Sequence, residues 1–176
     1  MLASSNAIYL DASVLPKIEI EEDPKSVARI LIFGSLIPIF CSRVGFGEFI
    51  AVMGRRPTQA RIGTAGYLYV CRALLKDFEI GKLRWAEPVP DKPPFIRLAE
   101  ELLSRHSSLG GGDLWHMMST LQLNSTNPPA TLFSFDRDLV KAATSEGLRA
   151  VDGNAVDPGA LVRAMTAQGK WMAAHP

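Results

Sequence analysis

Two short apolar segments of this 176-residue chain end at an aspartate, and this pattern restricts the possible folds more than any other feature. Residues 7–10 (AIYL) precede Asp11, and residues 131–135 (TLFSF) precede Asp136. Neither segment has the spacing of an amphipathic helix, so both are typical of buried strands. Segments with helical spacing lie between them, which favours an α/β sandwich around a mostly parallel sheet.

Apolar spacing, glycines and prolines predict the other elements. We expect helices near residues 24–33, 43–53, 58–78, 95–105, 113–123 and 136–146, and strands near 37–41, 84–89 and 149–151. The helix at 58–78 is expected from apolar residues at helical spacing, which include Leu68 and Tyr69, and the helix at 95–105 is expected to turn Ile96 and Leu103 inward. Residues 1–157 are predicted to form one domain, and residues 158–176 a terminal helix and tail.

Composition narrows the functional class. The formal net charge is only +1, which excludes a protein that coats nucleic acid through bulk charge. Cys41 and Cys71 have no zinc-binding spacing, so we expect two buried, reduced thiols in a cytoplasmic protein. Residues 1–10 do not resemble a signal peptide, and the apolar stretch at 30–41 is shorter than the roughly 20 residues that span a bilayer. We therefore expect a mature protein that begins near Met1 and has no membrane segment.

Glu48 is the acid that most needs an explanation. Its expected helix is apolar nearly all round, with Ala51 and Val52 on the same side as Glu48. A carboxylate buried there must be compensated by a cation, a hydrogen-bond network or a change of protonation. A structural ion pair with Arg43 or Arg55 is the alternative to metal binding or catalysis.

Three aspartates fall at the ends of expected elements. Asp11 and Asp136 follow strands, where parallel sheets bind ligands, although an aspartate there often only caps a helix or makes a turn. Asp113 follows a glycine triplet at 110–112 and is expected to be a helix N-cap that also faces a shared metal. Asp138 is either an outer ligand or a first-turn helix acid, and we favour the helix acid.

The donor set predicts the metal. Four carboxylates without a matching set of His or Cys residues suit Mg²⁺ or Mn²⁺ rather than zinc. His116 lies one turn after Asp113 without an HExxH pattern, so we expect a packed or capping histidine rather than a ligand.

Four motifs together resemble the PIN domain of VapC-like toxin ribonucleases. They are AIYLDAS with Asp11 and Ser13, RVGFGEFIAVM with Glu48, GGDLWHMMSTL with Asp113 and His116, and LFSFDRDL with Ser134 and Asp136. They occur in the family's order and structural contexts. The resemblance covers the whole chain, apart from the glycine triplet and the tail after Pro158.

This resemblance implies a three-layer α/β/α sandwich whose mostly parallel sheet has about four to five strands. It also implies hydrolysis of RNA phosphodiester bonds to a 5′-phosphate and a 3′-hydroxyl. Asp11, Glu48 and Asp113 would bind or position Mg²⁺ or Mn²⁺, and Asp136 would complete the site. Ser13 and Ser134 would donate hydrogen bonds that orient the acids. The implied partners are RNA, a small antitoxin and a second copy of the chain.

A local basic rim could hold the RNA phosphates. Arg43, Arg55, Arg56 and Arg61 bracket the Glu48 helix, and Arg137 follows Asp136. Each of these arginines could equally be a solvated helix residue.

Two other functions stay open. A phosphatase could use Asp11 as its nucleophile, but Ser13 stands where such enzymes want a second acid. The other alternative is a PIN-like scaffold without catalytic activity. The presence of all four acids argues against it.

Overall fold

The central sheet consists of five strands, all of them parallel. The computed structural model describes residues 7–19, 37–55, 58–88, 93–126, 130–161 and 163. Within these ranges the strand order is β3-β2-β1-β4-β5. The strands are β1 (Ala7–Leu10), β2 (Ile39–Cys41), β3 (Leu83–Trp85), β4 (Ala130–Ser134) and β5 (Arg149–Asp152). The predicted α/β sheet is confirmed.

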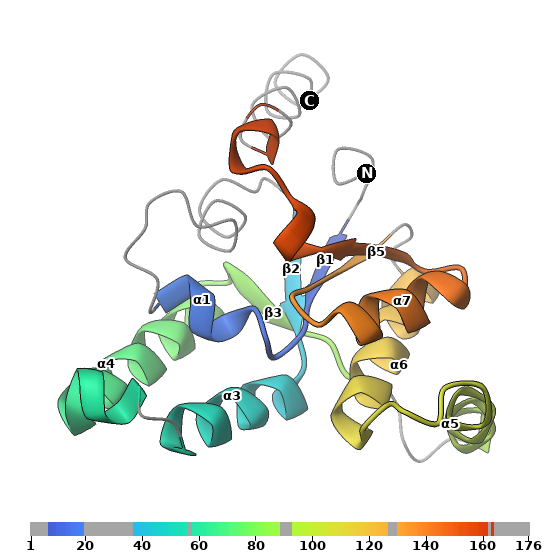
Figure 1. Cartoon of the computed structure of the whole chain (residues 1–176), viewed down its shortest axis with the longest axis horizontal. Helices are drawn as coiled ribbons and strands as arrows, with labels where there is room; N and C mark the ends of the chain where they lie inside the picture. Colours follow the sequence, from blue (N-terminus) through green and yellow to red (C-terminus); the bar gives the residue numbers. More distant parts are fainter. Residues whose placement is uncertain are drawn as a thin grey trace.

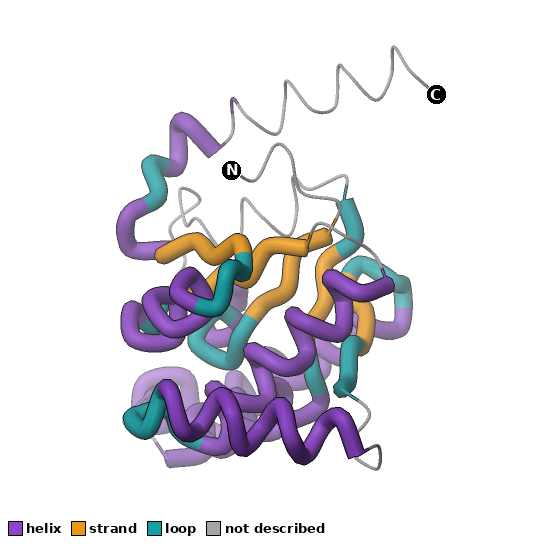
Figure 2. The backbone as a smooth tube through the Cα atoms, turned by 90° about the vertical axis from the view of Figure 1, so that its right-hand side faces the viewer, coloured by secondary structure: helices purple, strands orange, loops and turns teal. Residues whose placement is uncertain are grey.

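Helices cover both faces of this sheet (Figure 1). One layer contains α1 (Leu15–Glu19), α3 (Arg43–Arg55) and α4 (Thr58–Glu79). The other contains α5 (Pro93–Arg105), α6 (Gly111–Thr126) and α7 (Arg137–Ser145). A 3₁₀ turn, η2 (Gly153–Ala155), follows β5. Figure 2 shows the last described helical turn, near residue 160, standing beyond the sheet. The predicted three-layer sandwich is confirmed.

Strand β1 divides the core between the two layers. Ile8 and Leu10 belong to the apolar cluster that α3 and α4 close, whereas Ala7 and Tyr9 belong to the cluster that α6 and α7 close. Every residue of β1 and β4 is buried. Burial on both faces explains why neither segment alternates polar with apolar residues.

The predicted inward side of α5 is wrong at two positions, because Ile96 and Leu103 are exposed. Leu68 and Tyr69 on α4 are exposed as well, Tyr69 by 71%. Apolar residues occupy more of each helix circumference than the sheet can cover, because only one side of a surface helix meets the core. A glycine with a left-handed backbone, Gly63 (φ 63°), also interrupts α4.

Other differences concern element boundaries and single residues. Helix α1 was not predicted, α3 continues one residue past Gly54, and Cys71 is only partly buried. The helix expected at 24–33 lies outside the described residues, as does most of the tail from 158 to 176, so the domain division stays a prediction. None of the described helices combines the length and apolarity needed to cross a bilayer.

Candidate active site

A pocket of about 550 Å³ opens at the carboxyl edge of the sheet and contains all four predicted acids. Asp11 follows β1, Glu48 lies on α3, Asp113 on α6, and Asp136 between β4 and α7. β1 and β4 are neighbours with Leu10 opposite Phe133, which brings the first and last acids to one edge. The other residues lining the pocket are Ala12, Ser13, Pro16, Lys17, Ala51, Val52, His116 and Phe135.

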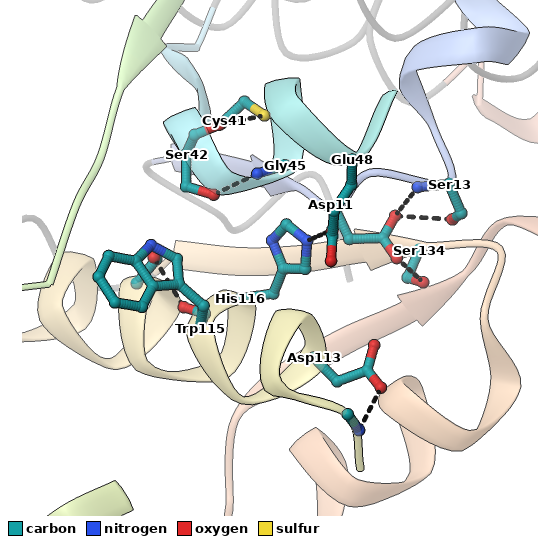
Figure 3. A network of polar contacts seen from close by, with 12 residues as sticks. Asp11, Ser13, Cys41, Ser42, Gly45, Glu48, Asp113, Trp115, His116 and Ser134 are labelled. Atoms are coloured by element: carbon teal, nitrogen blue, oxygen red, sulfur yellow. Dashed lines mark hydrogen bonds and ion pairs between the residues drawn. The ribbon is translucent and has the colours of Figure 1, made fainter. Parts of the chain in front are cut away.

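Asp11 is the most enclosed of the four acids, with only 4% of its surface exposed. Its Oδ1 accepts hydrogen bonds from the backbone N–H of Ser13 at 3.0 Å and from Ser13 Oγ at 2.6 Å, and its Oδ2 accepts from Ser134 Oγ at 2.7 Å (Figure 3). Burial raises the pKa of Asp11, although His116 and the two serines oppose this effect. The carboxylate is therefore oriented by hydrogen bonds in a poorly solvated place.

The two serines also tie Asp11 to the end of β4. Ser13 Oγ accepts from the backbone N–H of Phe135 at 2.9 Å, and Ser134 Oγ accepts from that of Asp136 at 2.8 Å. Because these N–H groups are donors, each hydroxyl can direct its own proton to Asp11. Both serines thus donate hydrogen bonds to Asp11, as the sequence predicts.

Glu48 reaches the pocket from α3 and contacts α6. Its Oε2 lies 3.1 Å from Nε2 of His116, and 40% of its side chain is exposed. The expectation of an enclosed carboxylate is therefore wrong, because the side of α3 that carries Glu48, Ala51 and Val52 lines the open pocket. Arg43 is not its partner, since the guanidinium of Arg43 faces Glu87.

His116 is the packed histidine that the sequence predicts, but it packs inside the site. Only 1% of its surface is exposed. Its Nδ1 lies 2.8 Å from the hydroxyl of Tyr9 on β1, while its Nε2 faces Glu48. Sequence analysis missed Tyr9, which looks like any core residue of a buried strand.

Asp113 occupies the third position of α6 rather than the N-cap. The helix begins at Gly111, and Asp113 Oδ2 accepts from the backbone N–H of Gly110 at 3.0 Å. This is the reach-back half of a capping box. The prediction that Asp113 is the N-cap is therefore wrong, because Gly110, three residues earlier, holds that position. The pKa of Asp113 is raised mainly by burial, and the carboxylates of Asp136 and Glu48 raise it further.

Asp136 is the N-cap of α7 and lines the pocket at the same time. Its Oδ1 accepts from the backbone N–H groups of Asp138 and Leu139 at 2.8 and 3.1 Å. Asp138 is an exposed acid in the first turn of α7 and does not line the pocket. Its position agrees with the helix-acid interpretation.

Lys17 is the basic residue that lines the pocket, and the sequence prediction missed it. Its Nζ lies 4.5 Å from the centre of the Phe135 ring. Arg43 and Arg137 instead face Glu87 and Asp152 at 3.8 and 3.4 Å, are largely exposed, and do not line the pocket. The side chains of Arg55, Arg56 and Arg61 lie outside the described part of the chain.

The pocket offers oxygen donors but no closed metal cage. Among the described side chains, no group of three or more His, Cys, Asp or Glu residues lies close enough together to hold a metal ion. The four acids nevertheless line one pocket, and the effect of Asp136 and Glu48 on the pKa of Asp113 shows that like charges gather there. Mg²⁺ commonly keeps several waters and binds only one or two carboxylates, so this donor set fits a hydrated hard cation.

Comparison with known proteins supports the fold. No family model and no curated protein matches the sequence. The structure of VapBC-1 from nontypeable Haemophilus influenzae aligns with 84% of this chain and 98% of its own, at 16% identity and a TM-score of 0.56. FitAcB from Neisseria gonorrhoeae aligns with 85% of this chain and 99% of its own, at 14% identity and a TM-score of 0.54. This chain has a PIN-like fold.

Proposed function

We propose that this chain is a metal-dependent endoribonuclease and the toxin of a toxin–antitoxin pair. The observation that carries the proposal is the pocket in which Asp11, Glu48, Asp113 and Asp136 meet at the carboxyl edge of a PIN-like sheet. The likeness to VapBC-1 and FitAcB, which are toxin–antitoxin complexes, supports the assignment to such a pair.

Carboxylates of these four acids would hold a hydrated Mg²⁺ or Mn²⁺, with water molecules in the remaining coordination positions. When bound, the ion would lower the pKa of a water molecule and offset the charge that builds on the scissile phosphate. Oxygen-only coordination is the kind that these ions prefer.

The protein's own groups prepare this pocket. Ser13 and Ser134 keep the Asp11 carboxylate oriented and favour its charged form against the effect of burial. Lys17 places a positive charge in the pocket that the four carboxylates line. We assign it to contact a substrate phosphate, because a cation at this position offsets the repulsion between the acids and the RNA backbone.

The deciding experiment is cleavage of an RNA panel by the purified protein with Mg²⁺ or Mn²⁺. We expect cleavage products with 5′-phosphates, complete loss with EDTA, and a loss on the order of 100-fold or more in Asp11→Asn and Asp113→Asn. Asp138→Asn is the matched control, because it removes the same charge from an exposed position outside the pocket. Undiminished cleavage by Asp11→Asn would overturn the site, and absence of any metal-dependent cleavage would favour a silent scaffold.

The antitoxin would be a small protein whose basic tail enters the acidic pocket. Expression of this chain alone should arrest growth, and co-expression of the neighbouring gene should restore it. The Asp11→Asn variant should be harmless yet still co-purify with the neighbour's product. Growth that is unaffected by the wild-type chain would point to a nuclease outside a toxin–antitoxin pair.

A further inference from the structure

The carboxylate of Glu48 occupies a slot in the first turn of α6. A Cβ atom added to Gly112 would lie 1.8 Å from Oε1 of Glu48, 2.7 Å from its Cδ and 3.1 Å from its Oε2. Any side chain at position 112 must therefore displace the carboxylate. The neighbouring Gly111 differs, because a Cβ there would meet no atom within 4 Å.

The opposite wall of the slot is His116, which lies beside Glu48 (Figure 3). Other residues hold its ring in place. A Cβ at Gly45 of α3 would lie 2.7 Å from Cε1 of His116, so the ring packs directly on the backbone of α3. The Tyr9 ring meets the His116 ring edge to face, with centroids 5.7 Å apart. The imidazole therefore has little freedom to turn.

The hydrogen-bond order of this cluster follows from its chemistry. A carboxylate only accepts hydrogen bonds, so Nε2 of His116 must carry the proton that faces Glu48. When the imidazole is neutral, Nδ1 is an acceptor and the hydroxyl of Tyr9, 2.8 Å away, donates to it. In that state Tyr9 favours the tautomer whose Nε2 proton faces Glu48.

We propose that Tyr9, His116 and Gly112 are positioning residues that fix the Glu48 carboxylate for a divalent ion. The inference rests on the proposed function, since it assigns Glu48 to the metal. It also explains one residue of the glycine triplet at 110–112, because Gly112 leaves the space that the Glu48 carboxylate fills. A long side chain that is 40% exposed would otherwise move among several rotamers, and ordering it in advance strengthens binding.

The first test compares Gly112→Ala with Gly111→Ala in the full chain. Alanine favours a helix over glycine at both positions, so neither variant should unfold at a lower temperature than the wild type. Titration with Mn²⁺, followed by electron paramagnetic resonance, should show affinity about 10-fold or more weaker in Gly112→Ala. Gly111→Ala should bind Mn²⁺ as the wild type does, because its methyl group meets open space.

The second test uses amides that imitate one nitrogen of His116 at a time. His116→Gln can keep a donor near the Nε2 position, whereas His116→Asn keeps one only near Nδ1. We expect His116→Asn and Tyr9→Phe to weaken Mn²⁺ binding roughly 10- to 100-fold, and His116→Gln to recover most of the loss. Circular dichroism and thermal unfolding would verify that each variant is folded, and a merely structural role would not separate Gln from Asn.

The outcomes separate this inference from the proposed activity. Equal Mn²⁺ affinity in Gly112→Ala and Gly111→Ala, or equal affinity in the two His116 amides, would overturn the positioning role even if the wild type cleaves RNA. The expected order of affinities in a protein that cleaves no RNA would support the positioning role and refute the nuclease.

Discussion

Ser134 donates a hydrogen bond to Oδ2 of Asp11 over 2.7 Å and joins two residues that are 123 positions apart in the chain. The same hydroxyl accepts from the backbone N–H of Asp136. One buried oxygen therefore helps to orient the acid that follows β1 and to fix the start of the helix after β4. Removal of the Ser134 hydroxyl should therefore lower both the catalytic rate and the stability of the protein.

Ser134→Ala should lower the rate of RNA cleavage by roughly 10- to 100-fold, because Asp11 loses one of the donors that orient it. It should also reduce the free energy of unfolding by about 1–3 kcal/mol, since the N–H of Asp136 is left without its acceptor. Cleavage assays and urea unfolding would measure the two effects. Ser145→Ala is the control, as that hydroxyl only bonds back to Ala142 within its own helix. A cleavage rate equal to the wild type's would refute the orienting role.

Asp11→Asn should abolish cleavage without lowering thermal stability at pH 7. Burial raises the pKa of Asp11 above its ordinary value of 3.8, so the folded protein binds this proton more tightly than the unfolded chain. The charged carboxylate therefore opposes folding at any pH above that range, and asparagine removes this cost. The advantage of the variant should shrink as the pH falls towards 3.8, where the wild-type acid becomes protonated. Thermal melts without metal between about pH 3.5 and about pH 8 would test this prediction. A variant that melts well below the wild type at pH 7 would contradict it.

Glu146→Gln should destabilise the contact between the ends of α5 and α7 at neutral pH. Arg105 binds both oxygens of Glu146 at 2.8 Å, and His106 lies 2.7 Å away. These contacts lower the pKa of Glu146 from 4.5 to about 2. The stability that comes from an acid whose pKa is lowered on folding is complete above pH 4.5 and is lost as the pH falls towards 2.

Because this ion pair lies near the surface, solvent screening limits the expected loss to about 1 kcal/mol or less. Urea unfolding of the variant and the wild type at pH 7 and near pH 2 would show the difference only at pH 7. Glu101→Gln should have no effect, because Glu101 is mostly exposed and 3.9 Å from Arg105. A loss that is the same at both pH values would assign the effect to packing instead.

Gly45→Ala should destabilise the protein by about 1–3 kcal/mol, because the added methyl group meets the buried His116 ring at 2.7 Å and the Cys41 sulfur at 3.2 Å. Gly47→Ala, two residues further along α3, should be neutral or stabilising by up to about 1 kcal/mol, since no atom lies within 4 Å. Chemical unfolding of the pair would separate crowding from helix propensity. Similar stabilities for the two variants would show that α3 and α6 can move apart.

The sequence predicts the acids at strand ends well because the reason is local. An apolar run followed by an aspartate places Asp11 and Asp136 at the carboxyl edge of any parallel sheet, whatever the rest of the chain does. The approximate positions of most helices and strands follow from apolar spacing in the same way.

Contacts between elements that are distant in the chain could not be predicted from local sequence patterns. The partner of Glu48 is a histidine 68 positions away, and the partner of that histidine is a tyrosine 107 positions away. Their meeting depends on how closely α3 and α6 approach, which no local spacing encodes. Lys17 was missed for a simpler reason, because α1 is too short to produce a helical pattern.

The paired glycines of α3 and α6 suggest how relatives of this chain can be recognised. Gly45 leaves room for His116, and Gly112 leaves room for Glu48, so each helix yields space to the other's polar side chain. A larger residue at 45 or 112 forces the helices apart or expels the opposite side chain. Positions 45, 48, 112 and 116 should therefore change together among homologues, and a family that gives up one of the two glycines should also have rebuilt this corner of its pocket.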